Sequence, residues 1–217
     1  MKKAILATIL LSAGVLLTSV VQAEDKVADS DASVKVTAGS GPVDPEDPNN
    51  PGGETGQNGP LSLDQVIQFE FADLKLSGGS TSVPLKATTM QNAQVTDARG
   101  TGAGWQLQVK QSELQTSDQT KTLKGAQINL ANAVVAAGRT NTSTDAPTMN
   151  TASLALNENY QPLTTAVAQT GLGTWLIKYN ADSTNDITLK VPAGNLIGDY
   201  TGTVTWQLSD SPTPTNP

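Results

Sequence analysis

The stretch RGTGAGWQLQV, residues 99–109, joins a glycine-rich turn to a strictly alternating pattern of apolar and polar residues. Trp105, Leu107 and Val109 are apolar, and the residues between them are Gln106 and Gln108. Because successive side chains of a strand point to opposite faces, the three apolar side chains share one face. The stretch therefore predicts a β-strand with one face in a hydrophobic core.

The same tripeptide, Trp-Gln-Leu, returns near the C-terminus in YTGTVTWQLSDSP, residues 200–212. The apolar face of this second strand contains Tyr200, Val204, Trp206 and Leu208, with Thr205 on the opposite face. Before the first strand, Gly102 and Gly104 let the chain turn sharply or let the Trp105 ring pack over backbone without a side chain. Both tryptophans thus lie in phase with a leucine two residues later.

Two interpretations of the tryptophans remain open. A Trp in phase with Leu and Val on a strand is typical of a core position. Trp is also rarely buried completely and often shows one face at a binding surface. Both interpretations hold if the rings lie at the rim of the fold. We expect the two strands to lie side by side or face to face, with Trp105 and Trp206 within roughly 10 Å of each other.

Short alternating segments separated by Gly, Asn, Asp, Ser and Thr continue along the chain, and sustained helical periodicity is absent. We expect strands at residues 67–71, 93–97, 104–110, 123–130, 152–156, 174–179, 187–191 and 200–208. Residues 138–151 should form a polar surface loop. This pattern predicts an all-β fold, a single β-sandwich or partly open barrel of short antiparallel strands.

Three regions differ in composition. Residues 1–23 combine Lys2 and Lys3 with an apolar run and end in Val-Gln-Ala, which predicts a secretory signal peptide. Residues 24–60 are rich in Asp, Pro and Gly and carry few large apolar residues, so we expect a disordered spacer. Residues 61–217 are the expected β domain. Removal of Lys2 and Lys3 leaves 11 basic against 20 acidic residues, a net charge of −9, which disfavours nucleic acid and anionic polymers as ligands.

The chain contains no His and no Cys. This composition excludes His-based triads, thiol nucleophiles, disulfides and the usual zinc ligands. A pair of carboxylates is the remaining route to hydrolysis, but no acidic residue lies in a recognisable catalytic motif. We expect a non-enzymatic protein without cofactor or metal.

Two polar motifs have simple structural interpretations. Asp97 and Arg99 are two residues apart at a strand end, and we expect a surface ion pair or loop brace worth at most about 1 kcal/mol. NADSTND, residues 180–186, places oxygen-bearing side chains at alternate positions. It lacks the glycine and final glutamate of an EF-hand and is interpreted as a polar turn.

The two Trp-x-Leu motifs resemble the two signatures of the WxL domain of Gram-positive surface proteins. The distal signature, Tyr-x-x-x-aliphatic-Thr-Trp-x-Leu-x-x-x-Pro, is matched by Tyr200, Val204, Thr205, Trp206, Leu208 and Pro212. The proximal signature is matched by Trp105 and Leu107, with Asp97, Arg99 and Gly100 before it. Relatives often carry Phe-Gly where this chain has Phe71-Ala72.

The resemblance implies a secreted protein of the cell surface that attaches non-covalently to the wall, with peptidoglycan as the ligand. It also implies other exported surface proteins as partners, including WxL-interacting proteins. The chain would then bind peptidoglycan directly or serve as the interaction subunit of a complex whose partner holds the wall. Trp105, Leu107, Tyr200, Thr205, Trp206 and Leu208 are the candidate binding or motif residues, supported by Asp97, Arg99, Gly102 and Gly104.

Overall fold

The structure is a computed structural model that describes residues 28–41, 43–46, 52–86, 89–179 and 186–210. The chain divides into two units, residues 1–35 and 36–217, and all strands lie in the second. The described residues form twelve strands and no helix, so none of them forms a helix that is able to cross a membrane.

The strands form three four-stranded sheets in which all pairs are antiparallel. The first sheet has the order β1 (Leu61–Gln65), β3 (Gln91–Asp97), β10 (Gly173–Tyr179), β6 (Val134–Ala137). The second has the order β12 (Val204–Ser209), β4 (Trp105–Gln111), β9 (Gln161–Ala166), β7 (Thr148–Met149). The third has the order β2 (Thr81–Pro84), β11 (Ile187–Val191), β5 (Gln127–Ala131), β8 (Ser153–Ala155).

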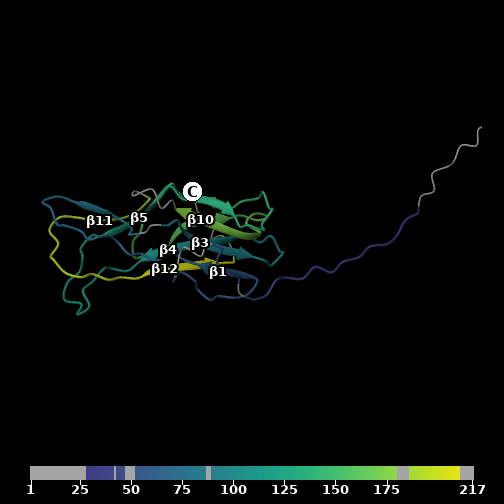
Figure 1. The fold of residues 1–217 in the computed structure, drawn as a ribbon, viewed down its shortest axis with the longest axis horizontal. Coiled ribbons are helices and arrows are strands. Elements are labelled where there is room, and N and C mark those ends of the chain that lie inside the picture. Colours follow the sequence, from purple (N-terminus) through teal and green to yellow (C-terminus); the bar gives the residue numbers. More distant parts are fainter. Residues whose placement is uncertain (1–27, 42, 47–51, 87–88, 180–185, 211–217) are drawn as a thin grey trace, which may run out of the picture. The chain divides into compact units, whose positions relative to one another are not determined.

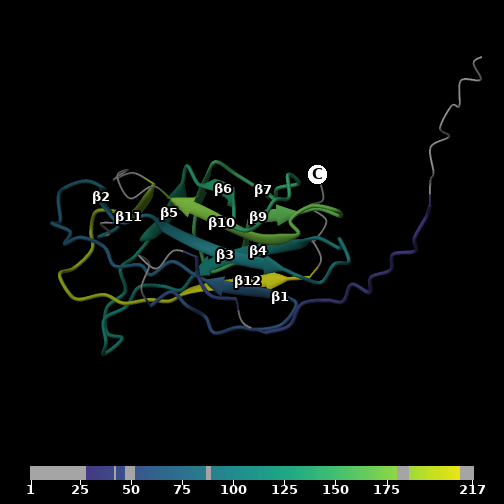
Figure 2. The same ribbon diagram turned by 45° about the vertical axis from the view of Figure 1, so that its right-hand side comes forward.

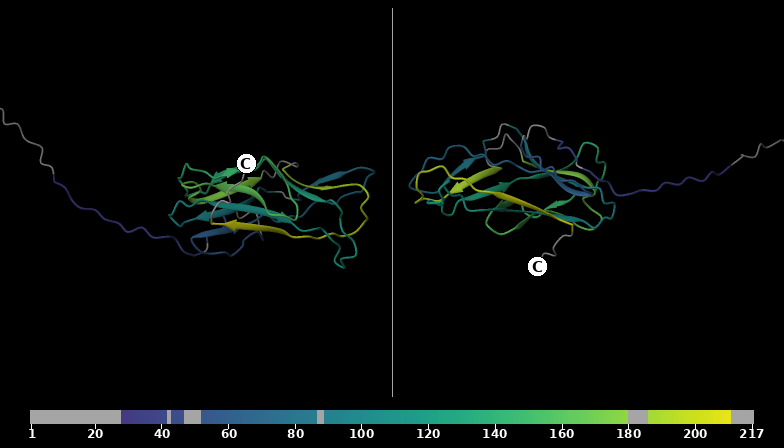
Figure 3. Two further views of the ribbon diagram at one scale, coloured as in Figure 1. Left: turned by 180° about the vertical axis from the view of Figure 1, so that it is seen from behind. Right: turned by 90° about the horizontal axis from the view of Figure 1, so that it is seen from below.

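One hydrophobic core connects the three sheets. It contains Val95 and Ile177 of the first sheet, Trp105 of the second, and Leu130 and Leu189 of the third. Figures 1 and 2 show the strands of the first two sheets grouped together, with β2, β11 and β5 toward the other end of the domain. The views from behind and below in Figure 3 show the same arrangement. The sheets do not close into a barrel, and the predicted all-β sandwich of short antiparallel strands is confirmed.

Seven of the eight expected strands coincide with or overlap β3, β4, β5, β8, β10, β11 and β12. The strand expected at residues 67–71 is wrong, since Phe71 makes only an isolated bridge, to Leu85. Here the Ala72 amide donates to the carbonyl of Pro84 (3.2 Å). Proline has no N–H to return this bond, so the pairing ends at Ala72 on that side of the bridge.

The two Trp-x-Leu strands lie side by side, as expected. β12 pairs with β4 in a register that sets Leu208 opposite Leu107 and Trp206 opposite Val109. The proximity expected for the two tryptophans is wrong. Trp206 is four residues out of register with Trp105, which separates their Cα atoms by about 14 Å along the strands.

The described parts of the expected spacer contact the β domain. The Gly39 amide donates to the Ala98 carbonyl (2.9 Å), and the Glu46 amide donates to Oε1 of Gln94 (2.8 Å). Nearer the first strand, the Thr55 amide donates to the Asp64 carbonyl (3.0 Å). The scarcity of apolar side chains gave no sign of these contacts, because backbone and polar groups make them. The disordered spacer expected over residues 24–60 stays a prediction.

A buried carboxylate lies beneath this attached segment. Asp64 in β1 is 3% exposed and accepts hydrogen bonds from Ser62 Oγ (2.5 Å), Thr96 Oγ1 (2.7 Å) and Gln94 Nε2 (3.1 Å). Gln94 in turn donates to the carbonyl of Asp44 (3.2 Å). Burial raises the pKa of Asp64, and the three hydrogen bonds oppose this shift without cancelling it.

The raised pKa of Asp64 predicts a stabilising substitution. A carboxyl group with a raised pKa binds its proton more tightly in the folded state, so its contribution to stability grows as the pH falls toward the folded pKa and is lost above it. We expect Asp64→Asn to raise the melting temperature at about pH 7. The difference from the unsubstituted chain should shrink as the pH falls through the raised folded-state pKa of Asp64, where Asp64 itself becomes protonated. A lower melting temperature for Asp64→Asn at neutral pH would contradict this account.

Candidate functional site

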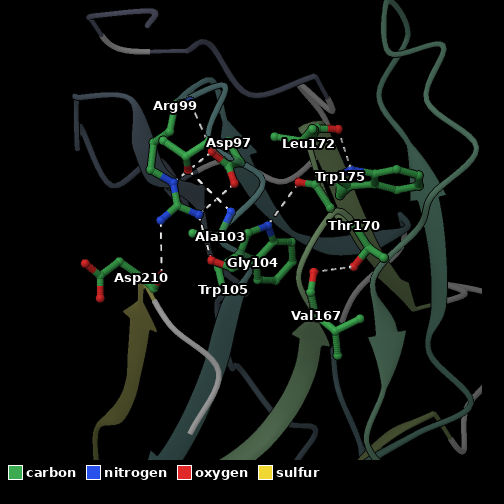
Figure 4. Close-up of polar contacts among 12 residues, drawn as sticks. Asp97, Arg99, Ala103, Gly104, Trp105, Val167, Thr170, Leu172, Trp175 and Asp210 are labelled. Carbon is green, nitrogen blue, oxygen red and sulfur yellow. Dashed lines mark hydrogen bonds and ion pairs between the residues drawn. The ribbon is translucent and has the colours of Figure 1, made fainter.

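The proximal tryptophan is a core residue. Trp105 is fully buried, and Leu107 and Val109 beside it on β4 are also 0% exposed. Its indole Nε1 donates to the carbonyl of Gly171 (3.0 Å). Figure 4 shows the Trp105 ring with a dashed line from its nitrogen for this bond. A buried indole N–H needs such a partner, so the Gly171 carbonyl completes the environment of the ring. Trp105 and Leu107 therefore stabilise the fold and present no surface to a ligand.

The glycines before Trp105 have distinct roles. Gly102 has φ +65°, and its carbonyl accepts a bond from the Gln169 amide (2.8 Å). Gly104 has φ +80°, and a Cβ there would contact the Ala166 carbonyl oxygen and lie 2.9 Å from the Val167 carbonyl carbon. Only glycine combines this left-handed conformation with such a close approach of two backbones.

Gly100 provides a matched control, because it has φ +68° and open space around its Cβ position. We expect Gly100→Ala to cost about 1–2 kcal/mol of stability, the strain of the left-handed conformation alone. Gly104→Ala should cost about 2–5 kcal/mol, because overpacking against the Ala166–Val167 backbone adds about 1–3 kcal/mol to the same strain. Urea unfolding of both variants measures the difference. Equal losses of stability in the two variants would show that the close approach of the Gly104 backbone to the Ala166–Val167 backbone is unimportant.

The carboxylate of the Asp97–Arg99 ion pair is buried and Arg99 is partly buried, which corrects the expectation of a surface pair. The side chain of Asp97 is 0% exposed and that of Arg99 is 14% exposed. The guanidinium binds the carboxylate through two bonds, Nε to Oδ1 (2.9 Å) and Nη2 to Oδ2 (2.7 Å). The backbone of the loop after β3 has positive φ at Gly100 and Gly104, and the Gly104 carbonyl accepts a hydrogen bond from the Arg99 guanidinium. The spacing in sequence indicated the pair but not its burial.

Arg99 also joins the two motif strands. Its Nη2 donates to the carbonyl of Gly104, directly before β4 (2.7 Å), and its Nη1 donates to the carbonyl of Asp210, directly after β12 (3.1 Å). Figure 4 shows the guanidinium between these groups and Asp97. The hydrogen bonds to Asp97 raise the pKa of Arg99, so the guanidinium is permanently charged. Arg99 therefore fixes the ends of β4 and β12 relative to each other.

The distal motif, in contrast, borders an open cleft of about 1090 Å³. Trp206 and Tyr200 are half-buried and line this cleft. Leu208 and Thr205 are also half-buried but do not line it. The Tyr200 hydroxyl donates to the Leu196 carbonyl (2.9 Å), which holds the ring against its own loop. Of the six candidate motif residues, only these two are placed to contact a ligand in the cleft.

Two chain segments without regular strands form the walls of the cleft, residues 66–76 and 196–203. Phe69 and Phe71 line the first wall. The Phe69 ring lies near-parallel to Trp206, with centroids 6.5 Å apart and planes at 19°. Phe69 and Phe71 lie 6.3 Å apart with planes at 26°. The wrongly predicted strand at 67–71 therefore supplies the aromatic wall of the cleft.

The cleft gathers four of the eight aromatic residues of the chain, including both phenylalanines. Three aliphatic residues on its lining are exposed: Leu76 (43%), Leu196 (62%) and Ile197 (81%). Its charged lining residues are Glu70, Asp73, Lys75 and Asp199. The alternation of Phe69 and Phe71 was visible in the sequence, but it indicated burial in a core. Their convergence with Trp206 depends on the tertiary structure.

Potential catalytic and metal-binding groups are few. Glu70 forms an exposed ion pair with Lys86 (2.8 Å). Within the described ranges, no three acidic side chains are grouped as a metal site. The motif at residues 180–186, which was expected to form a polar turn, lies outside the described residues except for Asp186. The Oδ1 of Asp186 accepts a hydrogen bond from Asn132 Nδ2 (2.8 Å). The cleft thus offers aromatic surface and hydrogen-bonding groups.

Comparison with known proteins agrees with these features. The family model described as "WxL domain surface cell wall-binding" matches residues 23–212, most of the chain. No curated protein and no solved structure matches the chain. The matched region contains both Trp-x-Leu strands, the Asp97–Arg99 pair and the aromatic cleft. The protein therefore belongs to the WxL family of surface, cell-wall-binding domains.

Proposed function

We propose that this protein is a non-enzymatic component of the cell surface that binds peptidoglycan directly and non-covalently. The observation that carries the proposal is the open aromatic cleft beside the distal motif, lined by Trp206, Tyr200, Phe69 and Phe71. Concave sites with aromatic walls and a few polar groups are typical binding sites for small molecules and polymer segments. Trp105, Leu107 and Arg99 support this cleft indirectly, because they hold β4 and β12 together.

Sedimentation with purified insoluble peptidoglycan tests the proposal. We expect the mature chain, residues 24–217, to sediment with the insoluble material in the absence of any other protein. The net charge of −9 makes unspecific electrostatic adsorption to anionic wall polymers unfavourable, so binding should persist at raised salt. A chain that stays in the supernatant under all conditions would contradict direct binding.

A second function, as the interaction subunit of a surface complex, is favoured by the exposed aliphatic side chains. Leu196 and Ile197 lie together beside the cleft, and exposed apolar groups of this kind often mark protein interfaces. In this case a WxL-interacting partner would hold the wall. Sedimentation only after addition of such a partner would select this alternative.

Catalytic turnover is not expected. Incubation with peptidoglycan should release neither reducing ends nor free amines, because the cleft provides no His or Cys and its Glu70 is paired with Lys86. A muramidase serves as the positive control for the assay. Turnover that disappears in Asp73→Asn or Asp199→Asn would contradict the prediction, since both carboxylates line the cleft.

A further inference from the structure

We propose that the cleft recognises the glycan strand of peptidoglycan, not its peptide stems. The row of rings formed by Trp206, Phe69 and Phe71, here called the aromatic row, is the surface on which the sugar rings pack. This inference rests on the proposed function and specifies which part of the polymer is bound. Its basis is the geometry of the rings, the charges around them and the absence of groups that bind carboxylates.

The aromatic row is built to contact flat, weakly polar surfaces. Its successive ring planes differ by 19° and 26°, and each of the three rings is half-buried. A pyranose ring presents faces of C–H groups, which carry a partial positive charge and pack on the negative face of an aromatic ring. Phe69 stacks with both Phe71 and Trp206, and the parts of the three rings that remain exposed therefore offer packing surface to more than one pyranose of a linked polymer.

The polar lining of the cleft suits neutral hydroxyl and amide groups. Asp73 and Asp199 are exposed carboxylates on the two walls and are able to accept hydrogen bonds from sugar hydroxyls. Thr201 and Thr203 add hydroxyl groups. Uncharged N-acetylhexosamines match this set without burying a charge.

The same lining disfavours the peptide stems. Stem peptides end in carboxylates, which proteins recognise best with the two-pronged guanidinium of arginine. Among the described residues that line the cleft there is no arginine, and the one lysine, Lys75, is outnumbered by the acidic residues Glu70, Asp73 and Asp199. A carboxylate in this cleft would meet net negative charge and no matched donor.

Tryptophan fluorescence of the mature chain provides a direct test. Trp105 and Trp175 are 0% and 3% exposed, so the half-buried Trp206 is the tryptophan that responds to a ligand in the cleft. We expect a hexamer of β-1,4-linked N-acetylglucosamine to shift the emission in a saturable manner, whereas a free stem pentapeptide leaves it unchanged. By calorimetry, Trp206→Phe and Phe71→Leu should each weaken hexamer binding about tenfold, because each removes stacking area but keeps an apolar side chain.

Tyr160→Ala is the matched control. Tyr160 is an aromatic residue of 39% exposure that does not line the cleft, so hexamer binding should be unchanged. Thermal melting of all variants separates lost stacking from lost folding. Binding of whole peptidoglycan without binding of the hexamer would overturn this inference and leave the proposed function intact. A fluorescence response to the pentapeptide alone would also overturn the inference. So would an equal loss of hexamer affinity in Tyr160→Ala and Phe71→Leu.

Discussion

Substitution of Trp105 by alanine is expected to lower the free energy of unfolding by about 3–5 kcal/mol. The ring is fully buried, so its removal opens a large cavity between β4 and the loop that precedes β10. It also leaves the Gly171 carbonyl without its indole donor. A domain of this size is stabilised by only about 5–15 kcal/mol in total, so the loss is a large fraction. Urea denaturation with an unchanged m-value measures it directly.

Trp206→Ala is the matched comparison for this result. Trp206 occupies the equivalent motif position but is half-buried, so we expect a much smaller loss of stability than for Trp105→Ala. The two motif tryptophans would then differ in function, the first acting in folding and the second in binding. A melting temperature for Trp105→Ala equal to that of the unsubstituted chain would refute the assignment of Trp105 to the core.

Removal of the guanidinium in Arg99→Ala is expected to cost about 3–5 kcal/mol. The substitution leaves the carboxylate of Asp97 buried and removes both guanidinium donors, while the backbone amide of residue 99 still donates to Oδ1 (3.1 Å). It also frees the carbonyls of Gly104 and Asp210, so the ends of β4 and β12 lose their connection. The main cause of the loss in Arg99→Ala is the buried, unpaired carboxylate of Asp97. The double variant Asp97→Ala/Arg99→Ala should therefore lose less stability than the sum of the losses in the two single variants.

The exposed pair of Lys86 and Glu70 is a control within the same chain. Its N–O distance is 2.8 Å, close to that of the Asp97–Arg99 pair, but its side chains are 67% and 75% exposed. We expect Lys86→Ala to leave the unfolding midpoint unchanged, because water screens and replaces this contact. A similar loss for Lys86→Ala and Arg99→Ala would show that burial is not the reason for the effect.

Part of the candidate site was predictable from local patterns. The alternation in residues 105–109 and 204–208 identified both motif strands, and the equal phase of Trp and Leu predicted their common inward face. Asp97 and Arg99 were recognised as a pair because two residues of spacing bring them to one side of the chain. Their burial was not predictable, since it depends on Gly104, Asp210 and the loop that surrounds them.

Other strands escaped prediction because their local sequences contradict a simple alternation. β1 carries Ser62, Asp64 and Gln65 as buried residues, and the buried carboxylate of Asp64 is tolerated because Ser62, Gln94 and Thr96 donate hydrogen bonds to it. β2 and β9 contain Pro84 and Pro162, which count against a strand in isolation. Both prolines nevertheless lie within paired strands of the structure.

The sequence by itself determined the fold class, because the period of a strand is a local property. It also indicated that the early and late Trp-x-Leu strands pair. The spacing of the motifs, which is local as well, indicated membership of the family. The tertiary structure alone decided that Trp105 is core and Trp206 borders a cleft. Register caused this difference, since an offset of four residues places one ring beneath the loop before β10 and the other beside Phe69. Long-range register depends on the packing of three sheets together, and no pattern within a single strand contains that information.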